Sequence, residues 1–130
     1  MKKIFTLLLG MLSFSACSHA QSDTIRTVSA TDFAQIIQSD SVILIDVRTV
    51  DEFGSGHIEG ARNIDVLKDD FEKTVSSTLP KDKTIAVYCR SGKRSMKAAN
   101  ILANKGYRVV NLRGGWIEWT EYERNKQGEK

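Results

Sequence analysis

Residues 84–95 read Thr-Ile-Ala-Val-Tyr-Cys-Arg-Ser-Gly-Lys-Arg-Ser, and this stretch changes character at its midpoint. Its first five residues form an apolar run, which is typical of a strand buried on both faces of a parallel sheet. A helix is expected from Ser95 to Lys105, with apolar positions at Met96, Ala99, Ile101 and Leu102. Gly106 follows at the position where a helix usually ends.

Strand and helix patterns alternate along the rest of the chain. Val42–Ile45 is a second continuous apolar run rich in β-branched residues, and shorter strands are expected at residues 25–28, 61–64 and 107–112. Helices are expected after Ser29 or Thr31, around residues 51–53, over residues 66–75 with Leu67, Phe71 and Val75 on one side, and after Gly114–Gly115. This alternation predicts an α/β fold with a parallel sheet and helices on both of its faces.

Cys89 ends the predicted strand of residues 84–88, and ligands of parallel α/β sheets bind beyond such strand ends. Helix N-termini and nearby basic residues lower the pKa of a thiol, and the thiolate is the reactive form. A strand-to-helix turn can also direct several backbone N–H groups at one anion. The sequence therefore predicts a nucleophilic cysteine with an anion-binding loop, formed by Arg90, Ser91, Gly92, Lys93, Arg94 and Ser95.

Length and composition limit the function classes. A chain of 130 residues has room for one ordinary domain. Its formal charge is +3, but without Lys2 and Lys3 the remaining 17 basic and 16 acidic residues leave only +1, which argues against a nucleic-acid binder. No group of residues has metal-ligand spacing, and neither a P-loop nor a dinucleotide fingerprint is present, so neither metal nor cofactor is expected.

The N-terminus resembles an export signal, since Lys2 and Lys3 precede a short apolar run over residues 4–14. The run is too short to span a bilayer as a helix. Two forms of processing remain open. Cleavage after Ala20 leaves a soluble protein, whereas the lipobox-like sequence Phe14-Ser15-Ala16-Cys17 would place a lipid on Cys17, although lipoboxes usually carry Leu where Phe14 stands. An ordinary N-terminal core helix is the alternative to a signal.

These patterns divide the chain into a signal peptide (residues 1–20, or ending at Cys17 with a lipid), a tether (21–24), a globular domain (25–124) and a polar tail (125–130). The expected location is the periplasm or the cell envelope, with membrane contact only through a lipid on Cys17. Either form of processing leaves Cys89 as the sole free thiol of the exported protein, which favours a chemical use for it.

Several spaced motifs together resemble the single-domain rhodaneses over about residues 25–124. They are Asp46-Val47-Arg48, Glu52-Phe53, the segment Gly56–Ile64, the loop Cys89–Ser95 and Gly114-Gly115-Trp116. The resemblance implies a five-stranded parallel sheet and a sulfurtransferase that forms a persulfide on Cys89. A small anionic donor such as thiosulfate would supply the sulfur, and a thiol or cyanide would accept it.

The resemblance also assigns roles within the loop. Backbone N–H groups from Arg90 to Ser95 would hold the negative sulfur, and Gly92 would allow the loop to close. Arg90, Lys93 and Arg94 would attract the donor and neutralise its leaving sulfonate. Cysteine phosphatases and arsenate reductases with related loops place five residues between cysteine and arginine, but here that position is Ser95 and the arginine comes one residue earlier, which favours sulfur transfer.

Other interpretations remain beside this one. The chain could be a non-catalytic rhodanese-like module that holds an anion or a partner, and a thiol redox protein is disfavoured because no resolving cysteine is present. Cys89 itself could be an inert buried residue. Asp46 and Arg48 are expected to brace loops by a salt bridge, His57 to belong to a structural turn, and Trp116 and Trp119 to pack.

Overall fold

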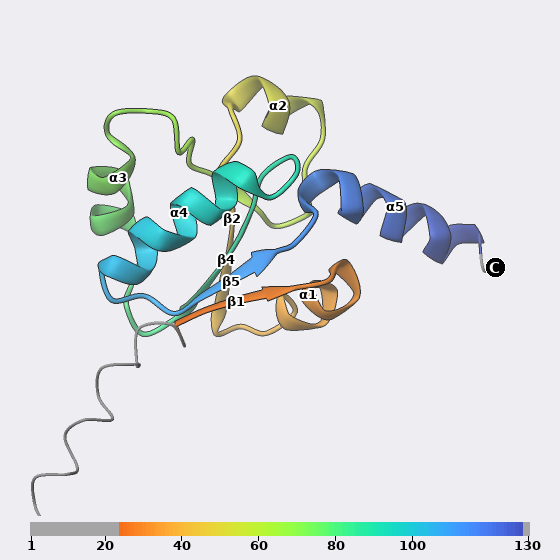
Figure 1. The fold of residues 1–130 in the computed structure, drawn as a ribbon, viewed down its shortest axis with the longest axis horizontal. Coiled ribbons are helices and arrows are strands. Elements are labelled where there is room, and N and C mark those ends of the chain that lie inside the picture. The colour runs from red at the N-terminus through yellow and green to blue at the C-terminus, as the bar shows by residue number, and fades with distance from the viewer. Residues whose placement is uncertain (1–23, 129–130) are drawn as a thin grey trace, which may run out of the picture.

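The computed structural model of the chain describes residues 24–128, so the predicted signal peptide and most of the predicted tether lie outside the described residues. Residues 24–128 form, in order, β1 (Ile25–Val28), α1 (Ala30–Ile36), β2 (Val42–Asp46), α2 (Val50–Ser55), β3 (Arg62–Asn63), α3 (Phe71–Thr78), β4 (Thr84–Tyr88), α4 (Lys93–Asn104), β5 (Val109–Leu112) and α5 (Gly115–Gly128) (Figure 1). All strands are parallel and lie in the order β1-β5-β4-β2-β3, which confirms the predicted five-stranded sheet.

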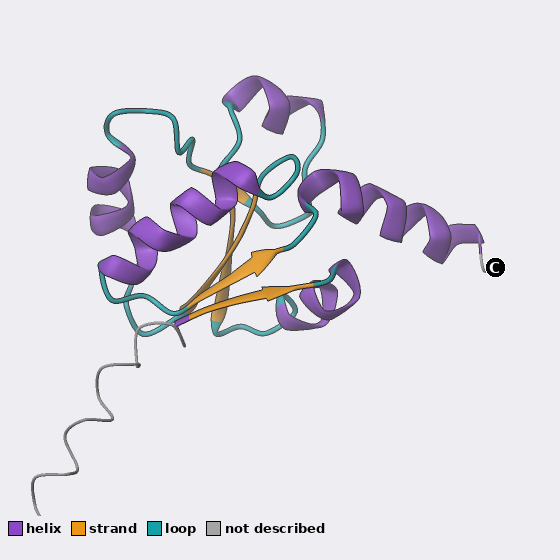
Figure 2. Ribbon diagram, in the orientation of Figure 1, coloured by secondary structure: helices purple, strands orange, loops and turns teal. Residues whose placement is uncertain are grey.

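Each face of the sheet carries its own apolar core. Along β4, Ile85 and Val87 pack in the core beneath α3 and α4, whereas Ala86 and Tyr88 pack in the core beneath α1 and α5. The sheet therefore lies between two layers of helices, as predicted (Figure 2). Burial on both faces explains why the central strand is apolar from Ile85 to Val87 and ends in the buried ring of Tyr88.

The carboxyl ends of the parallel strands meet at one edge of the sheet. Figure 1 shows α2 and the first turns of α4 and α5 gathered at this edge. Each of these helices follows a different strand, namely β2, β4 and β5. The topology thus brings three chain segments together around the end of β4, where Cys89 lies.

Two helices begin at residues other than those predicted. α4 begins at Lys93, two residues early, because Gly92 adopts a left-handed φ of +108° and turns the chain directly into the helix. α3 begins at Phe71, because the Asp65 side chain accepts the Leu67 N–H at 2.9 Å and holds a turn in the segment expected to be helical. Leu67 is consequently exposed instead of lying on the buried side of a helix.

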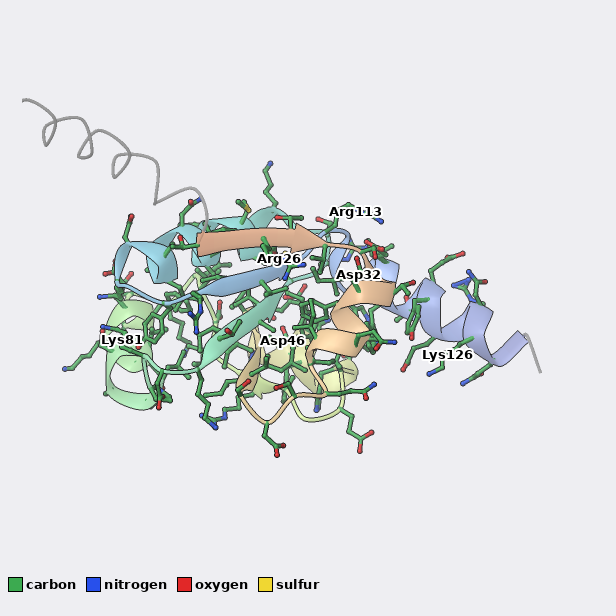
Figure 3. The ribbon with its side chains drawn as sticks, turned by 90° about the horizontal axis from the view of Figure 1, so that it is seen from below. Arg26, Asp32, Asp46, Lys81, Arg113 and Lys126 are labelled. Atoms are coloured by element: carbon green, nitrogen blue, oxygen red, sulfur yellow. The ribbon has the colours of Figure 1, made fainter. Side chains whose placement is uncertain are left out.

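The last helix continues past the predicted end of the domain. α5 runs to Gly128, so residues 125–128 of the predicted polar tail are helical, and all four are exposed. Its second half, with Lys126, extends away from the sheet (Figure 3). Within residues 24–128, no helix is both long enough and apolar enough to cross a membrane.

Candidate active site

Cys89 directly follows β4 and is only 1% exposed. The backbone N–H of Gly92 donates a hydrogen bond to the Cys89 sulfur at 3.1 Å, and the Ser95 hydroxyl oxygen lies 3.5 Å from the same sulfur. Ser95 also donates to the Gly92 carbonyl at 3.2 Å, which fixes the hydroxyl in the first turn of α4. The sulfur therefore lies within a turn that directs polar groups toward it.

The ionisation of Cys89 depends on two opposing effects. Burial by itself would raise the pKa of the thiol, because it disfavours the charged form. Hydrogen bonds from the hydroxyl and backbone N–H of Ser95, and from the backbone N–H groups of Gly92 and Ser91, lower it. The hydrogen bonds prevail, so the pKa of Cys89 lies below its ordinary value of 9.0. The site thus favours the nucleophilic thiolate.

The turn between β5 and α5 is hydrogen-bonded to the backbone of the Cys89 loop. The Trp116 N–H donates to the Cys89 carbonyl at 2.8 Å, and the Ile117 N–H donates to the Arg90 carbonyl at 3.1 Å. Gly115 has a left-handed φ of +62°, and a Cβ there would lie 2.5 Å from the Cys89 carbonyl oxygen. Only glycine fits between the two segments without displacing the loop. The sequence predicts a helix that begins at Gly114–Gly115, but no local pattern indicates the contact of Gly115 with this loop.

The predicted site residues surround the sulfur at different depths. Cys89 and Ser95 are buried, Gly92 and Arg94 are partly buried, and Arg90, Ser91 and Lys93 are exposed. Two of the three cations of the loop, Arg90 and Lys93, are thus exposed to solvent. Arg94 differs from the other two, because its side chain has a partner.

Arg94 forms an ion pair with Glu52, a residue that sequence analysis did not assign to the site. Two guanidinium nitrogens of Arg94 donate to the two carboxylate oxygens of Glu52, at 2.9 and 3.0 Å. The Arg94 hydrogen bond lowers the pKa of Glu52 to about 2. The pattern Thr49-x-x-Glu52 is a capping box that begins α2, and together with the motif Glu52-Phe53 it marks Glu52 in the sequence, but neither signal indicates the ion pair with Arg94.

Asp46 and Arg48 form a salt bridge that supports the segments around the site, as expected from the sequence. The Arg48 Nη2 donates to Asp46 at 2.7 Å and to the Gly56 carbonyl at 2.7 Å. The guanidinium lies near the rings of both Tyr88 and Trp116, 5.6 and 5.0 Å from their centroids. Figure 3 shows Asp46 in the interior of the molecule. This pair connects β2 to the segments around Cys89 without touching the sulfur.

His57 belongs to the end of α2 rather than to the site. Its Nδ1 lies 2.9 Å from the Phe53 carbonyl oxygen, and its ring stacks on that of Phe53 with centroids 3.7 Å apart. Within residues 24–128, no group of three or more His, Cys, Asp or Glu side chains is placed to hold a metal ion.

Known proteins are similar to this chain in sequence and in fold. Residues 29–122 match the rhodanese-like domain family. The chain is 37% identical over 89 residues to a sulfurtransferase of Allochromatium vinosum, with 68% of this chain and 80% of that protein covered. It is 33% identical over 123 residues to thiosulfate sulfurtransferase 18 of Arabidopsis thaliana, with 85% and 90% covered.

A solved structure agrees with the sequence relatives. The human single-domain sulfurtransferase superposes with a TM-score of 0.60 at 30% identity, covering 73% of this chain and 95% of that one. The family match over residues 29–122 includes the whole of the Cys89 loop. This chain therefore belongs to the rhodanese-like domain family.

Proposed function

We propose that this protein is a sulfurtransferase that carries a sulfane sulfur as a persulfide on Cys89. The Cys89 thiolate attacks the outer sulfur of a donor such as thiosulfate, and a new S–S bond forms while the donor's own S–S bond breaks. The bonding electrons leave with sulfite. An acceptor thiolate or cyanide then attacks the outer persulfide sulfur, and Cys89 departs as a thiolate. Atoms and charges balance in both steps without an oxidant or a reductant.

The hydrogen bonds to the Cys89 sulfur are the observation that carries this proposal. They lower the pKa of a thiol that burial alone would keep protonated. The donors are largely backbone N–H groups, which the fold already points at the sulfur, so no rearrangement is needed when negative charge develops there. The same donors would stabilise the terminal sulfur of the persulfide.

The choice of thiosulfate as the first donor to test comes from the relatives. One relative in Arabidopsis thaliana is named a thiosulfate sulfurtransferase. The exposed cations Arg90 and Lys93 flank the Cys89 turn and would attract such an anion. The same features suit other small anionic donors, so the donor class is an anion with a terminal sulfane sulfur.

Mass spectrometry of the purified protein tests the proposal directly. After incubation with thiosulfate, we expect Cys89 to gain one sulfur atom, and addition of cyanide should remove it and release thiocyanate. The Cys89→Ser variant should show neither change. If the wild-type protein gains no sulfur and forms no thiocyanate, the chain is better described as a non-catalytic module that binds an anion or a partner through its basic loop.

We further infer that the protein is exported, on the basis of the basic start and apolar run at residues 2–14. N-terminal sequencing and radiolabelled palmitate incorporation in a bacterial host would distinguish the two forms of processing. Cleavage before Gln21 without label indicates a soluble periplasmic protein, and label that is lost in Cys17→Ala indicates a lipid anchor. Recovery of unprocessed chain in the cytoplasmic fraction would contradict export.

A further inference from the structure

The Glu52–Arg94 ion pair connects α2 to the first turn of α4, beside the candidate site. Its carboxylate is fixed on both sides. Glu52 Oε1 accepts the Thr49 N–H at 2.9 Å and the Thr49 hydroxyl at 3.1 Å, and both oxygens accept from Arg94. The bidentate pair of Arg94 with Glu52 is of a kind that is among the stronger hydrogen-bonded pairs in proteins. The charge of Arg94 is therefore held in one place by a partner that the capping box of α2 immobilises.

This pair changes the charge that the site presents to an anion. The family resemblance implies that Arg94 binds the donor together with Arg90 and Lys93, but of the three only Arg90 and Lys93 are exposed. The depressed pKa of Glu52, about 2, means that its carboxylate stays ionised at neutral pH. The hydrogen bond to Glu52 is the main cause of the raised pKa of Arg94, and the nearby charge of Cys89 adds to it. An anion that approaches Cys89 thus meets a negative charge on Glu52 together with the positive charge of Arg94.

We propose that Glu52 tunes donor specificity by weakening the binding of doubly charged anions beside Cys89 more than that of singly charged ones. This inference rests on the proposed sulfurtransferase function and concerns the choice between its donors, which are dianions such as thiosulfate and monoanions with a terminal sulfane sulfur, such as organic thiosulfonates and persulfides. Coulomb energy is proportional to the product of the charges. At the same position, the Glu52 charge therefore opposes a dianion twice as strongly as a monoanion.

Two donors that differ in charge test the proposal in the Glu52→Gln variant. Thiosulfate is a dianion and benzenethiosulfonate a monoanion. Cys89 would take the outer sulfur of either, and sulfite or benzenesulfinate would leave with the bonding electrons. We expect the KM for thiosulfate to fall about three- to tenfold, as for a unit charge removed several ångströms away in a partly solvated site. The KM for benzenethiosulfonate should fall by only about the square root of that factor.

Two further variants separate charge from structure. Glu72→Gln removes a carboxylate that pairs with Lys105 at 3.3 Å at the far end of α4, and it should change neither KM. Thr49→Ala removes the hydroxyl that caps α2 and contacts Glu52 but leaves both charges of the ion pair, so the ratio of the two KM values should shift far less than in Glu52→Gln. Equal fold-changes for both donors in Glu52→Gln, an unchanged or higher KM for thiosulfate, or the same shift in Glu72→Gln would each overturn the proposal.

A second measurement does not depend on sulfur transfer. Sulfate, a dianion, and methanesulfonate, a monoanion, should protect Cys89 from alkylation by iodoacetamide when they occupy the loop. In Glu52→Gln the half-protecting sulfate concentration should fall about three- to tenfold, and that of methanesulfonate should fall less. If Cys89 accepts sulfur from no donor, the sulfurtransferase proposal fails, yet this comparison still decides the role of Glu52. Equal shifts for the two anions would overturn that role.

Discussion

Burial and hydrogen bonding act in opposite directions on the Cys89 sulfur, and their balance sets its reactivity. A thiol as deeply buried as Cys89 and without donors would keep its proton at neutral pH. Among the groups that lower its pKa, the Ser95 hydroxyl contributes most. This hydroxyl donates to the Gly92 carbonyl at 3.2 Å, and it can rotate to donate to the sulfur once the thiol loses its proton. One rotatable hydroxyl can therefore stabilise the charged form of the Cys89 sulfur.

We expect Ser95→Ala to raise the pKa of the Cys89 thiol. Thiolate forms as the pH rises through the pKa, so the rate of alkylation by iodoacetamide should follow a titration curve, and the midpoint in the variant should lie at higher pH. A hydrogen bond to a charged group contributes on the order of 1.5 kcal/mol, which is about tenfold in an ionisation constant. At any pH below both midpoints, the variant should react about tenfold more slowly.

Ser91→Ala is the matched control for this measurement. Ser91 lowers the pKa of Cys89 through its backbone N–H, which the substitution retains. Its titration curve should therefore coincide with that of the wild-type protein. If Ser95→Ala also leaves the midpoint in place, the backbone donors alone set the pKa, and the role given to the hydroxyl is wrong.

At the scale of helices and strands, local sequence predicted the buried strands well and the start of α4 less well. The apolar runs of residues 42–45 and 84–88 coincide closely with β2 and β4, because a strand buried on both faces is mostly apolar. The early start of α4 depends on Gly92, whose left-handed φ places its α-carbon against the Arg113 carbonyl. A Cβ on Gly92 would lie 2.5 Å from that oxygen. This contact between Gly92 and Arg113 joins segments that are distant in sequence, so it cannot be predicted from the local sequence pattern.

In the candidate site too, the part formed by contiguous residues could be predicted from the sequence, and the part formed by tertiary contacts could not. The segment Cys89–Ser95 could be predicted because its residues are contiguous and their chemistry is recognisable. Glu52 could not be assigned to the site, because 42 residues separate it from Arg94. The capping box at Thr49 explains why Glu52 begins α2, but it does not reveal which cation the carboxylate meets. Which loop cations are free is thus a property of how α2 and α4 pack at the sheet edge.

For the molecule as a whole, the buried Asp46–Arg48 pair connects the sheet to the segments that surround the site. Both side chains are nearly inaccessible, and Arg48 also donates to the Gly56 carbonyl at 2.7 Å. The guanidinium lies over the Trp116 ring at the start of α5. A single buried cation therefore holds β2, the end of α2 and α5 together. Removal of its carboxylate would leave a charge in the interior without a counter-ion, which is far more costly than loss of an exposed pair.

We expect Asp46→Asn to lower the free energy of unfolding by about 3–5 kcal/mol, the usual cost of leaving one member of a buried pair alone. Urea denaturation followed by tryptophan fluorescence measures this change, since Trp116 contacts Arg48. Glu121→Gln is the control, because its exposed pair with Arg124 should contribute less than about 1 kcal/mol. An equally small loss in Asp46→Asn would mean that the Gly56 carbonyl and the aromatic rings suffice to hold Arg48, and that the carboxylate is not what joins these elements.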